Sequence, residues 1–531
     1  MAPIPQKQRA VQLVGPDELK INESKPVPEP GPRQILAKVE AVGLCFSDLK
    51  LLKQFSRHAR KSPVTAGLDA TTLSEMPNYV PGEYPAVPGH ETVVRVVKTG
   101  REASHHRVGG RYLVQTDYRW LPTATSNAAF GYNFEGALQE YVLMDERVVL
   151  SPEGESMLIP VPEDMSASAL ALVEPWACVE KAYAEKQRRT LKPGGHLLVV
   201  GETPVDRTSL KTLGGDPATT TFARADRIGG LKDGAYDDII YLGANPATAG
   251  CLFPKLAAGG LFNITQCGGR FGRPVVCQIG RVHYGGIRVV GTPGADPAKA
   301  MATIPATAEI RPNTKINIVG AAGPMGTMHV VRALTGGVAG VKVFAGDLSD
   351  ERLAALRALA EPVAHKNKLT LRLYNPANSR PADAFDYIVL MAPVPALVVQ
   401  SLADAARGAV INIFAGLPPD TTAALDLDTY IDKRLYLVGT SGSELDDMKR
   451  VLAKVVARQL DTNLSVAAVA GLDGAIDGIR AVEKNLMSGK ILVYPGARGL
   501  PLTPLAGLDV PLDNGRWSRK SEEALLQQYT T

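Results

Sequence analysis

Three short segments in the first third of the chain carry side chains that could together hold one metal ion. The first contains Cys45, the second contains His90 and Glu91, and the third contains Glu174. A catalytic zinc ion takes about three protein ligands, and thiolate sulfur, imidazole nitrogen and carboxylate oxygen are donors that it prefers. The sequence therefore predicts a zinc site in which Cys45 and His90 are ligands and either Glu91 or Glu174 supplies the oxygen.

Two polar residues beside Cys45 could support the chemistry of such a site. Ser47 lies two positions after Cys45, so in an extended segment both side chains would face the same side. The Ser47 hydroxyl could then pass a substrate proton toward solvent, and Asp48 could orient a ligating histidine through its free ring nitrogen. We expect Ser47, Asp48 and Glu91 to take part in catalysis. Of Glu91 and Glu174, the one that does not bind the metal would lie in the outer shell of the metal site.

A later segment has the pattern of a dinucleotide-binding turn. The stretch KINIVGAAGPMGTMHVVRAL combines an apolar strand, a glycine-rich turn and an apolar helix. Glycines permit the tight turn and a close approach of the backbone, and the helix N-terminus attracts the pyrophosphate. The expected cofactor contacts are Gly320, Gly323, Pro324, Met325 and Gly326.

The segment VKVFAGDLSDERL, about twenty residues further on, is expected to choose between NAD and NADP. Asp347 ends the second strand, where a carboxylate accepts hydrogen bonds from the ribose hydroxyls and repels a 2′-phosphate, which favours NAD. Arg352 is the alternative, because an arginine near this position can receive that phosphate. Asp347 could also serve only as the N-cap of the helix that follows.

Composition excludes several classes of protein. A chain of 531 residues exceeds one core, and 45% hydrophobic with 21% charged residues is typical of a soluble globular protein. The net charge of +4 and the lack of a dense basic run give no reason to expect nucleic acid. No segment is apolar enough to span a membrane or to form a signal peptide. Five scattered cysteines argue against a disulfide framework and favour the cytoplasm.

The elements that must position these residues form a β-rich part and an α/β part. Alternating segments punctuated by proline and glycine predict strands before residue 50 and again after residue 90, whereas residues 51–84 are polar and suggest an insertion or surface loop. Strands and helices alternate from about residue 191, which is typical of a doubly wound parallel sheet. The predicted domains are a catalytic domain (1–190), an abbreviated α/β unit (191–310), a complete α/β unit (311–464) and a C-terminal return to the catalytic domain (465–531).

The α/β part is predicted to contain a duplication. YDDII resembles FDYIV at an offset of 149, and IRVVGT resembles LYLVGT at 148, but the opening strands HLLVVG and INIVG are only 119 apart. The first copy should therefore lack about thirty residues, which would hold a phosphate-binding helix and the next two strands. Glu202 follows its first strand and would repel a pyrophosphate, so this copy is not expected to bind nucleotide. Similarity of composition alone is the alternative explanation.

The motifs resemble those of the zinc-dependent medium-chain alcohol and polyol dehydrogenase family. The matching segments are Cys45-Phe46-Ser47-Asp48, Gly89-His90-Glu91 and Glu174-Pro175. The resemblance implies a GroES-like catalytic domain joined to a Rossmann domain, and hydride transfer between NAD(H) and a secondary alcohol or ketone. The glutamate at 174 resembles the sorbitol branch, so the implied substrate is a polyol, sugar or sugar phosphate. The chain looks like a long, atypical member related to the L-sorbose-1-phosphate reductases.

Departures from the family pattern qualify these expectations. Residues 92–172 contain no cysteine, so one catalytic zinc and no structural zinc is expected. Lys50 stands where many relatives carry a histidine, and the interval from Cys45 to His90 is about twice the usual length. Basic residues in that interval could meet a substrate phosphate or simply be solvated: Arg57, Arg60 and Lys61. The expected partners are a small-molecule alcohol or ketone substrate and further copies of the same chain, in a homodimer or homotetramer. A zinc-free reductase or a non-catalytic regulatory member of the same superfamily remains the alternative.

Overall fold

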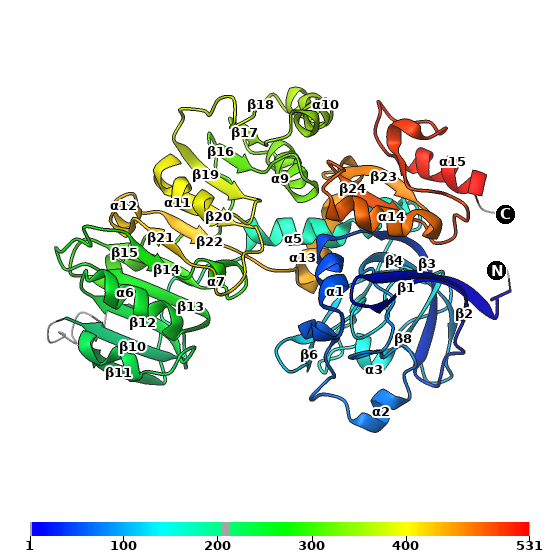
Figure 1. Ribbon diagram of the computed structural model, residues 1–531, viewed down its shortest axis with the longest axis horizontal. Coiled ribbons are helices and arrows are strands. Elements are labelled where there is room, and N and C mark those ends of the chain that lie inside the picture. The colour runs from blue at the N-terminus through cyan, green and yellow to red at the C-terminus, as the bar shows by residue number, and fades with distance from the viewer. Residues whose placement is uncertain (1–2, 203–209, 211–212, 530–531) are drawn as a thin grey trace. The chain divides into compact units, whose positions relative to one another are not determined.

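The chain folds into two compact units. A computed structural model describes residues 3–202, 210 and 213–529 (Figure 1). One unit consists of residues 1–177 and 443–531, and the other of residues 178–442. Helix α13 (Leu445–Val456), which precedes the predicted boundary at residue 465, lies in the first unit. At its N-terminal end the carbonyl oxygen of Ser443 accepts a hydrogen bond from Gln115 Nε2 at 3.2 Å.

The first unit is built on a largely antiparallel sheet of eight strands, in the order β25-β23-β24-β3-β4-β5-β9 with β8 also on β3. Its strands are β3 (Gln34–Gly43), β4 (Glu91–Thr99), β5 (Arg111–Val114), β8 (Tyr141–Asp145), β9 (Leu158–Pro160), β23 (Val466–Ala470), β24 (Lys490–Val493) and β25 (Thr503–Pro504). Two hairpins accompany it: β1 (Lys7–Gly15) with β2 (Glu18–Pro26), and β6 (Asp117–Pro122) with β7 (Asn127–Ala129). Strands close to each end of the sequence thus share one sheet, as the predicted C-terminal return requires.

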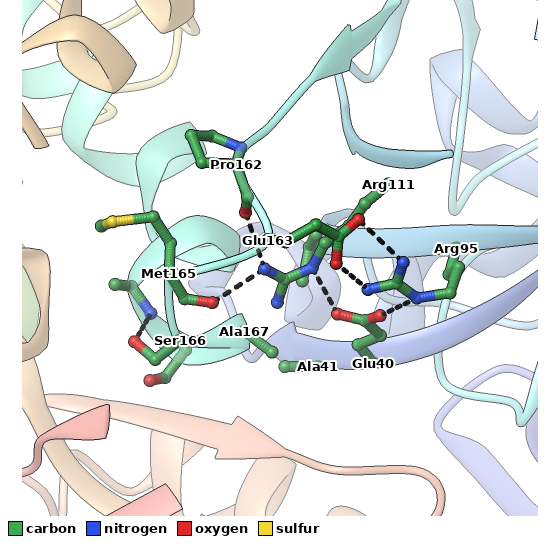
Figure 2. Close-up of polar contacts among 12 residues, drawn as sticks. Glu40, Ala41, Arg95, Arg111, Pro162, Glu163, Met165, Ser166 and Ala167 are labelled. Carbon is green, nitrogen blue, oxygen red and sulfur yellow. Dashed lines mark hydrogen bonds and ion pairs between the residues drawn. The ribbon is translucent and has the colours of Figure 1, made fainter. Parts of the chain in front are cut away.

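Helices in the first unit are mostly short: α1 (Phe46–Gln54), α2 (Ala70–Ser74), α3 (Glu146–Val149), α4 (Ala167–Ala171), α14 (Leu472–Glu483) and α15 (Arg519–Tyr529). A network of charged residues fixes the segment that leads into α4 (Figure 2). Glu40 accepts hydrogen bonds from Arg95 Nε at 2.8 Å and from Arg111 Nε at 2.7 Å. Arg111 also donates to the carbonyl oxygens of Pro162 and Met165, at 3.0 and 2.7 Å. Strands β3, β4 and β5 are thereby tied to the segment that leads into α4.

Residues 51–84, expected to be an insertion or a surface loop, are not a surface loop throughout. Helix α1 continues to Gln54, and Leu51, Leu52 and Phe55 are buried. The ammonium of Lys61 is buried as well and donates to the carbonyl oxygens of Val80 and Tyr84. The apolar residues at helical spacing draw the segment into the core, which the polar composition of the rest of the segment obscured.

The second unit begins in α5 (Val173–Ala184) and contains both α/β copies. The second copy is a six-stranded parallel sheet in the order β18-β17-β16-β19-β20-β22, which is the doubly wound 3-2-1-4-5-6 arrangement. Its strands are β16 (Lys315–Val319), β17 (Lys342–Gly346), β18 (Thr370–Tyr374), β19 (Phe385–Leu390), β20 (Ala405–Ile413) and β22 (Tyr436–Val438). Its helices are α9 (Pro324–Thr335), α10 (Asp350–Lys366), α11 (Pro395–Asp404) and α12 (Leu427–Asp432).

The first copy repeats this sheet in shorter form, in the order β11-β10-β12-β13-β15. Its elements are β10 (His196–Gly201), β11 (Thr219–Arg224), β12 (Tyr236–Leu242), α6 (Pro246–Leu252), β13 (Leu256–Thr265), α7 (Gly280–His283), β15 (Arg288–Thr292) and α8 (Pro297–Met301). The predicted fold class, a β-rich unit with a duplicated Rossmann-like sheet, is confirmed. One detail is wrong: only one of the two strands expected to be missing is missing, because β11 pairs with β10.

The expected loss of a phosphate-binding helix from the first copy falls on residues 203–209, 211 and 212, which lie outside the described part of the chain. None of the helices within the described part combines the length and apolar character that a bilayer crossing requires.

Candidate metal and dinucleotide sites

Cys45 lies at the N-terminus of α1, in extended conformation with φ −122° and ψ 150°. Its backbone N–H donates to Asp48 Oδ2 at 3.0 Å, which is half of a capping box that fixes the start of the helix. The expectation that Ser47 continues an extended segment is wrong, because Ser47 is in the first helical turn. The Ser47 hydroxyl nevertheless lies 3.1 Å from Cys45 Sγ, so the two side chains still face each other.

His90 is held against the start of α1 by hydrogen bonds at both ring nitrogens. Its Nδ1 lies 3.1 Å from Asp48 Oδ1, and its Nε2 lies 3.1 Å from the Ser47 hydroxyl. Asp48 therefore caps the helix with one oxygen and orients the imidazole with the other. This is the outer-shell role in which a carboxylate fixes the ring and directs the second nitrogen toward a metal.

The charge next to His90 controls its protonation. Burial alone lowers the pKa of the imidazole, but the charge and hydrogen bond of Asp48 outweigh burial and raise the pKa well above its ordinary value. Coordination at Nε2 requires that this nitrogen carries no proton, so metal binding there would release one proton to solvent.

Glu91 is the first residue of β4 and is fully buried. Its Oε1 accepts a hydrogen bond from Lys490 Nζ at 2.6 Å, and the same ammonium donates to the Leu44 carbonyl oxygen at 2.7 Å. Its Oε2 is buried without a hydrogen-bond partner among the described residues. An orphaned, buried carboxylate oxygen is costly unless a ligand satisfies it, so this atom fits a bound cation.

Cys45, His90 and Glu91 form a group whose possible ligand atoms all lie within 4.8 Å of one another. His90 and Glu91 are buried and Cys45 is half-buried. Sulfur, nitrogen and oxygen donors in one group match the preferences of zinc, so the residues present fit that ion. Glu174, in the first turn of α5, is buried close by but is not part of the group. Burial raises the pKa of Glu174; the charge of Glu91 adds to this, whereas His90 and Lys490 oppose it.

Tyr132 was not among the site residues predicted from the sequence. Arg60 was considered there, but its contacts with Tyr132 and Asp117 were not predicted. The Tyr132 ring is buried, with its centroid 5.8 Å from that of His90. The Arg60 guanidinium lies 5.5 Å from the centre of the Tyr132 ring and 2.6 Å from Asp117 Oδ1. Of the three basic residues considered for a substrate phosphate, Arg57 is exposed and Lys61 is engaged by backbone carbonyls, so Arg60 is the one beside the donor group.

The glycine-rich turn joins β16 to α9. Gly320 adopts φ 83°, the left-handed region that favours glycine. A Cβ at Gly326 would meet the Gly320 carbonyl oxygen, so the helix can approach the strand only without a side chain there. Gly323 is the N-cap of α9, and Pro324 and Met325 are the first helical residues. The five predicted contact residues thus surround one helix N-terminus, the arrangement that accepts a pyrophosphate.

Asp347 and Arg352 form an ion pair with each other. From the sequence they were alternative candidates for the residue that selects between NAD and NADP. Arg352 Nη2 donates to Asp347 Oδ1 at 2.6 Å, and Asp347 Oδ2 accepts from the Ala322 N–H at 3.1 Å. The N-cap interpretation of Asp347 is wrong, because Ser349 caps α10. The carboxylate therefore ties the second strand to the glycine-rich turn, and its charge is partly balanced by the arginine.

In the first copy, Glu202 occupies the corresponding turn. Sheet register aligns Gly201 with Gly320, so Glu202 stands where the second copy has Ala321. Its carboxylate accepts hydrogen bonds from the Tyr241 hydroxyl and, at 3.0 Å, from the Asn245 N–H at the N-cap of α6. The Glu202 side chain thus stands at the carboxyl ends of these strands, where the second copy has its glycine-rich turn.

A GroES-like β unit with Rossmann-like sheets is the architecture of medium-chain dehydrogenases. Residues 31–153 match the alcohol dehydrogenase GroES-like domain family. The chain is 29% identical to L-sorbose 1-phosphate reductase of Klebsiella pneumoniae over 41% of this chain and 56% of that protein. It is 26% identical to sorbitol dehydrogenase of Bacillus subtilis over 38% of this chain and 51% of that protein. The chain therefore spans a little over half the length of these curated relatives.

The fold is similar to that of 2R,3R-butanediol dehydrogenase from Bacillus subtilis. The TM-score is 0.54 at 16% identity, over 92% of this chain and 99% of the other. The resemblance to the zinc-dependent medium-chain alcohol and polyol dehydrogenases is thereby confirmed in domain content and in fold.

Proposed function

We propose that this chain is a zinc-dependent oxidoreductase that transfers a hydride between NAD(H) and a secondary alcohol or ketone. The observation that carries the proposal is the group of Cys45, His90 and Glu91, in which one buried carboxylate oxygen of Glu91 has no partner in the described protein. The complete Rossmann sheet, with its glycine-rich turn, supports a dinucleotide as the second component.

The roles of the chain's own residues follow from their contacts. Zinc would supply a Lewis acid that lowers the pKa of the substrate hydroxyl, and NAD would supply the hydride acceptor. Asp48 holds the His90 ring, and Lys490 holds Glu91 and balances its charge. Ser47 contacts both Cys45 Sγ and His90 Nε2, so its hydroxyl is the group placed to carry a proton away from the donor group.

The proposed substrate is a polyol, a sugar or a sugar phosphate. The names of the sorbose-phosphate and sorbitol relatives support this class. Arg60 supports a phosphorylated member of it, because its guanidinium lies over Tyr132 beside His90 and can exchange part of its contact with Asp117 for a phosphate. We further propose NAD as the preferred cofactor, one zinc per chain, and assembly into a homo-oligomer.

Metal content tests the proposal directly. Elemental analysis of the purified chain should find about one zinc, and Cys45→Ser should lose it while NADH binding, followed by fluorescence, is retained. The matched control is Cys251→Ser, because Cys251 is an exposed cysteine in the other unit and should leave the zinc in place. Wild-type chain that neither contains zinc nor takes it up would overturn the proposal in favour of a zinc-free reductase or a non-catalytic relative.

A further inference from the structure

The two α/β copies meet through a strand pair that is symmetric about its own centre. Strand β14 (Val275–Cys277) of the first copy pairs antiparallel with β21 (Ala423–Leu425) of the second. Val276 lies opposite Ala424, and these two residues are 148 apart, the same offset that relates β15 to β22. The same offset makes Val275 the equivalent of Ala423 and Cys277 the equivalent of Leu425. The two flanking pairs, Val275–Leu425 and Cys277–Ala423, are therefore equivalent to each other. A residue that faces its own equivalent marks a two-fold axis.

A second pair of contacts repeats across that axis. A Cβ at Gly291 would lie 2.5 Å from Ile431 Cγ1 of the second copy. Its equivalent Gly439 would place a Cβ 2.8 Å from His283 Cα of the first copy, and His283 is the equivalent of Ile431. Each copy therefore has a glycine near the C-terminal end of its edge strand, β15 or β22, at which the short helix of the other copy packs. This reciprocity is the defining property of an isologous interface.

Polar contacts reinforce the junction. Arg270 of the first copy makes two hydrogen bonds of 2.8 Å to the Asp432 carboxylate of the second. Asp428 accepts from the N–H groups of Phe271 and Gly272 at 3.1 and 2.9 Å. Charged and backbone groups of the two copies are thus paired with each other across the junction, with the Arg270–Asp432 pair at its exposed rim.

The apolar core is also continuous across the junction. One continuous cluster of buried apolar residues runs through both copies, with Ile287 on one side and Leu435 on the other. A hollow between the two copies, next to Cys277 and Tyr430, has a volume of about 10 Å³. This is room for no more than about one water molecule. The two faces are therefore complementary in shape as well as in symmetry.

We infer that the first α/β copy acts as a built-in dimerisation partner of the second. It covers the two-fold symmetric face of the second copy, to which another chain of the same kind would otherwise bind. Because both copies belong to one polypeptide, the effective concentration of the partner is far above that of any free chain. The face around β21 and α12 is consequently unavailable to a second molecule, and any homo-oligomer must form through a different face. This inference does not depend on the proposed chemistry.

The test is a pair of cysteines on the axis. In a background in which the exposed Cys251 and Cys267 are serine, Val276→Cys and Ala424→Cys place two thiols opposite each other at exposed positions. Opposed residues of an antiparallel pair have Cα atoms about 4.5–5.5 Å apart, within the range of a disulfide. Mild oxidation should cross-link almost every chain internally. The product should migrate as a single chain on a non-reducing gel, and mass spectrometry should link the two strands.

Two other outcomes would overturn the inference. A covalent dimer would show that the face is filled by another chain, and no cross-link would show that the strands are not paired in solution. The matched control joins Val276→Cys to Glu351→Cys, an exposed residue of α10, and should not cross-link. A second variant, Ala423→Cys, uses the native Cys277 that lies opposite it and should give the same internal cross-link.

Discussion

The ammonium of Lys490 lies 2.6 Å from the carboxylate of Glu91, although 399 residues separate them in the chain. Both groups are buried, so removal of one leaves the other charged and uncompensated. We expect Lys490→Met to lower the free energy of unfolding of the first unit by about 3–5 kcal/mol, measured by urea denaturation. Lys490→Met combined with Glu91→Gln should recover much of the loss. Equal destabilisation by the single and double variants would show that the pair does not act as an ion pair.

Asp48 has two roles that a conservative substitution can separate. Asp48→Asn retains an oxygen for the Cys45 N–H but removes the charge that faces His90 Nδ1. Loss of an outer-shell carboxylate typically weakens metal binding by about 10–100-fold. We expect that loss in a zinc competition titration with a chromophoric chelator, at nearly unchanged thermal stability. Asp48→Ala should also lower the stability, and unchanged zinc affinity in both variants would refute the orienting role.

Arg60 is expected to recognise the phosphate of a phosphorylated substrate. A hydrogen bond to a charged group contributes roughly 1.5–3 kcal/mol, so Arg60→Ala should raise KM for a sugar phosphate by about tenfold or more. KM for the unphosphorylated polyol and both kcat values should change little. Arg57→Ala is the control, because Arg57 is exposed. Equal effects on both substrates would assign Arg60 to folding rather than to specificity.

The Asp347–Arg352 pair should set the preference between cofactors. Asp347→Ala removes the charge opposed to a 2′-phosphate and frees the guanidinium, so the affinity for NADPH relative to NADH should rise by about tenfold. Arg352→Ala should shift the ratio the opposite way. Fluorescence titration with both reduced cofactors measures the ratio without turnover. A ratio that neither substitution alters would exclude the pair from cofactor selection.

His329 should make the second unit sensitive to acid. It lies in α9 with Nδ1 2.7 Å from the Tyr183 hydroxyl, and burial, with a smaller contribution from Arg332, lowers its pKa from 6.5 to about 3. The unfolded state therefore binds a proton between about pH 6.5 and pH 3 that the folded state does not, so stability falls as the pH falls through this window. From pH 8 to pH 5 the loss attributable to His329 should be about 2 kcal/mol.

Denaturant unfolding at both pH values, with wild type and His329→Gln, measures this contribution as a difference. The variant should lose less stability on acidification, because glutamine does not titrate. His196→Gln replaces an exposed histidine of the same unit and should behave as wild type. Parallel pH profiles for all three proteins would contradict the assignment.

Much of the site is local in sequence and was predictable for that reason. Cys45, Ser47 and Asp48 belong to one helix start, and His90 and Glu91 are adjacent, so a few residues carry the pattern of ligand and support. The glycine-rich turn is equally local, because strand, turn and helix follow one another without interruption. The duplication was also visible, since equal offsets between similar strands require only that the chain be compared with itself.

Contacts between distant segments were not predictable in this way. Lys490, Tyr132 and the pairing of Arg352 with Asp347 depend on which strands become neighbours and on where side chains project after packing. The same holds for the junction of the two copies: the sequence alone determined that the α/β unit is repeated and that one copy is shorter. Only the tertiary structure decided that Val276 faces Ala424, because a two-fold axis is a property of how two surfaces pack and leaves no local pattern in the chain.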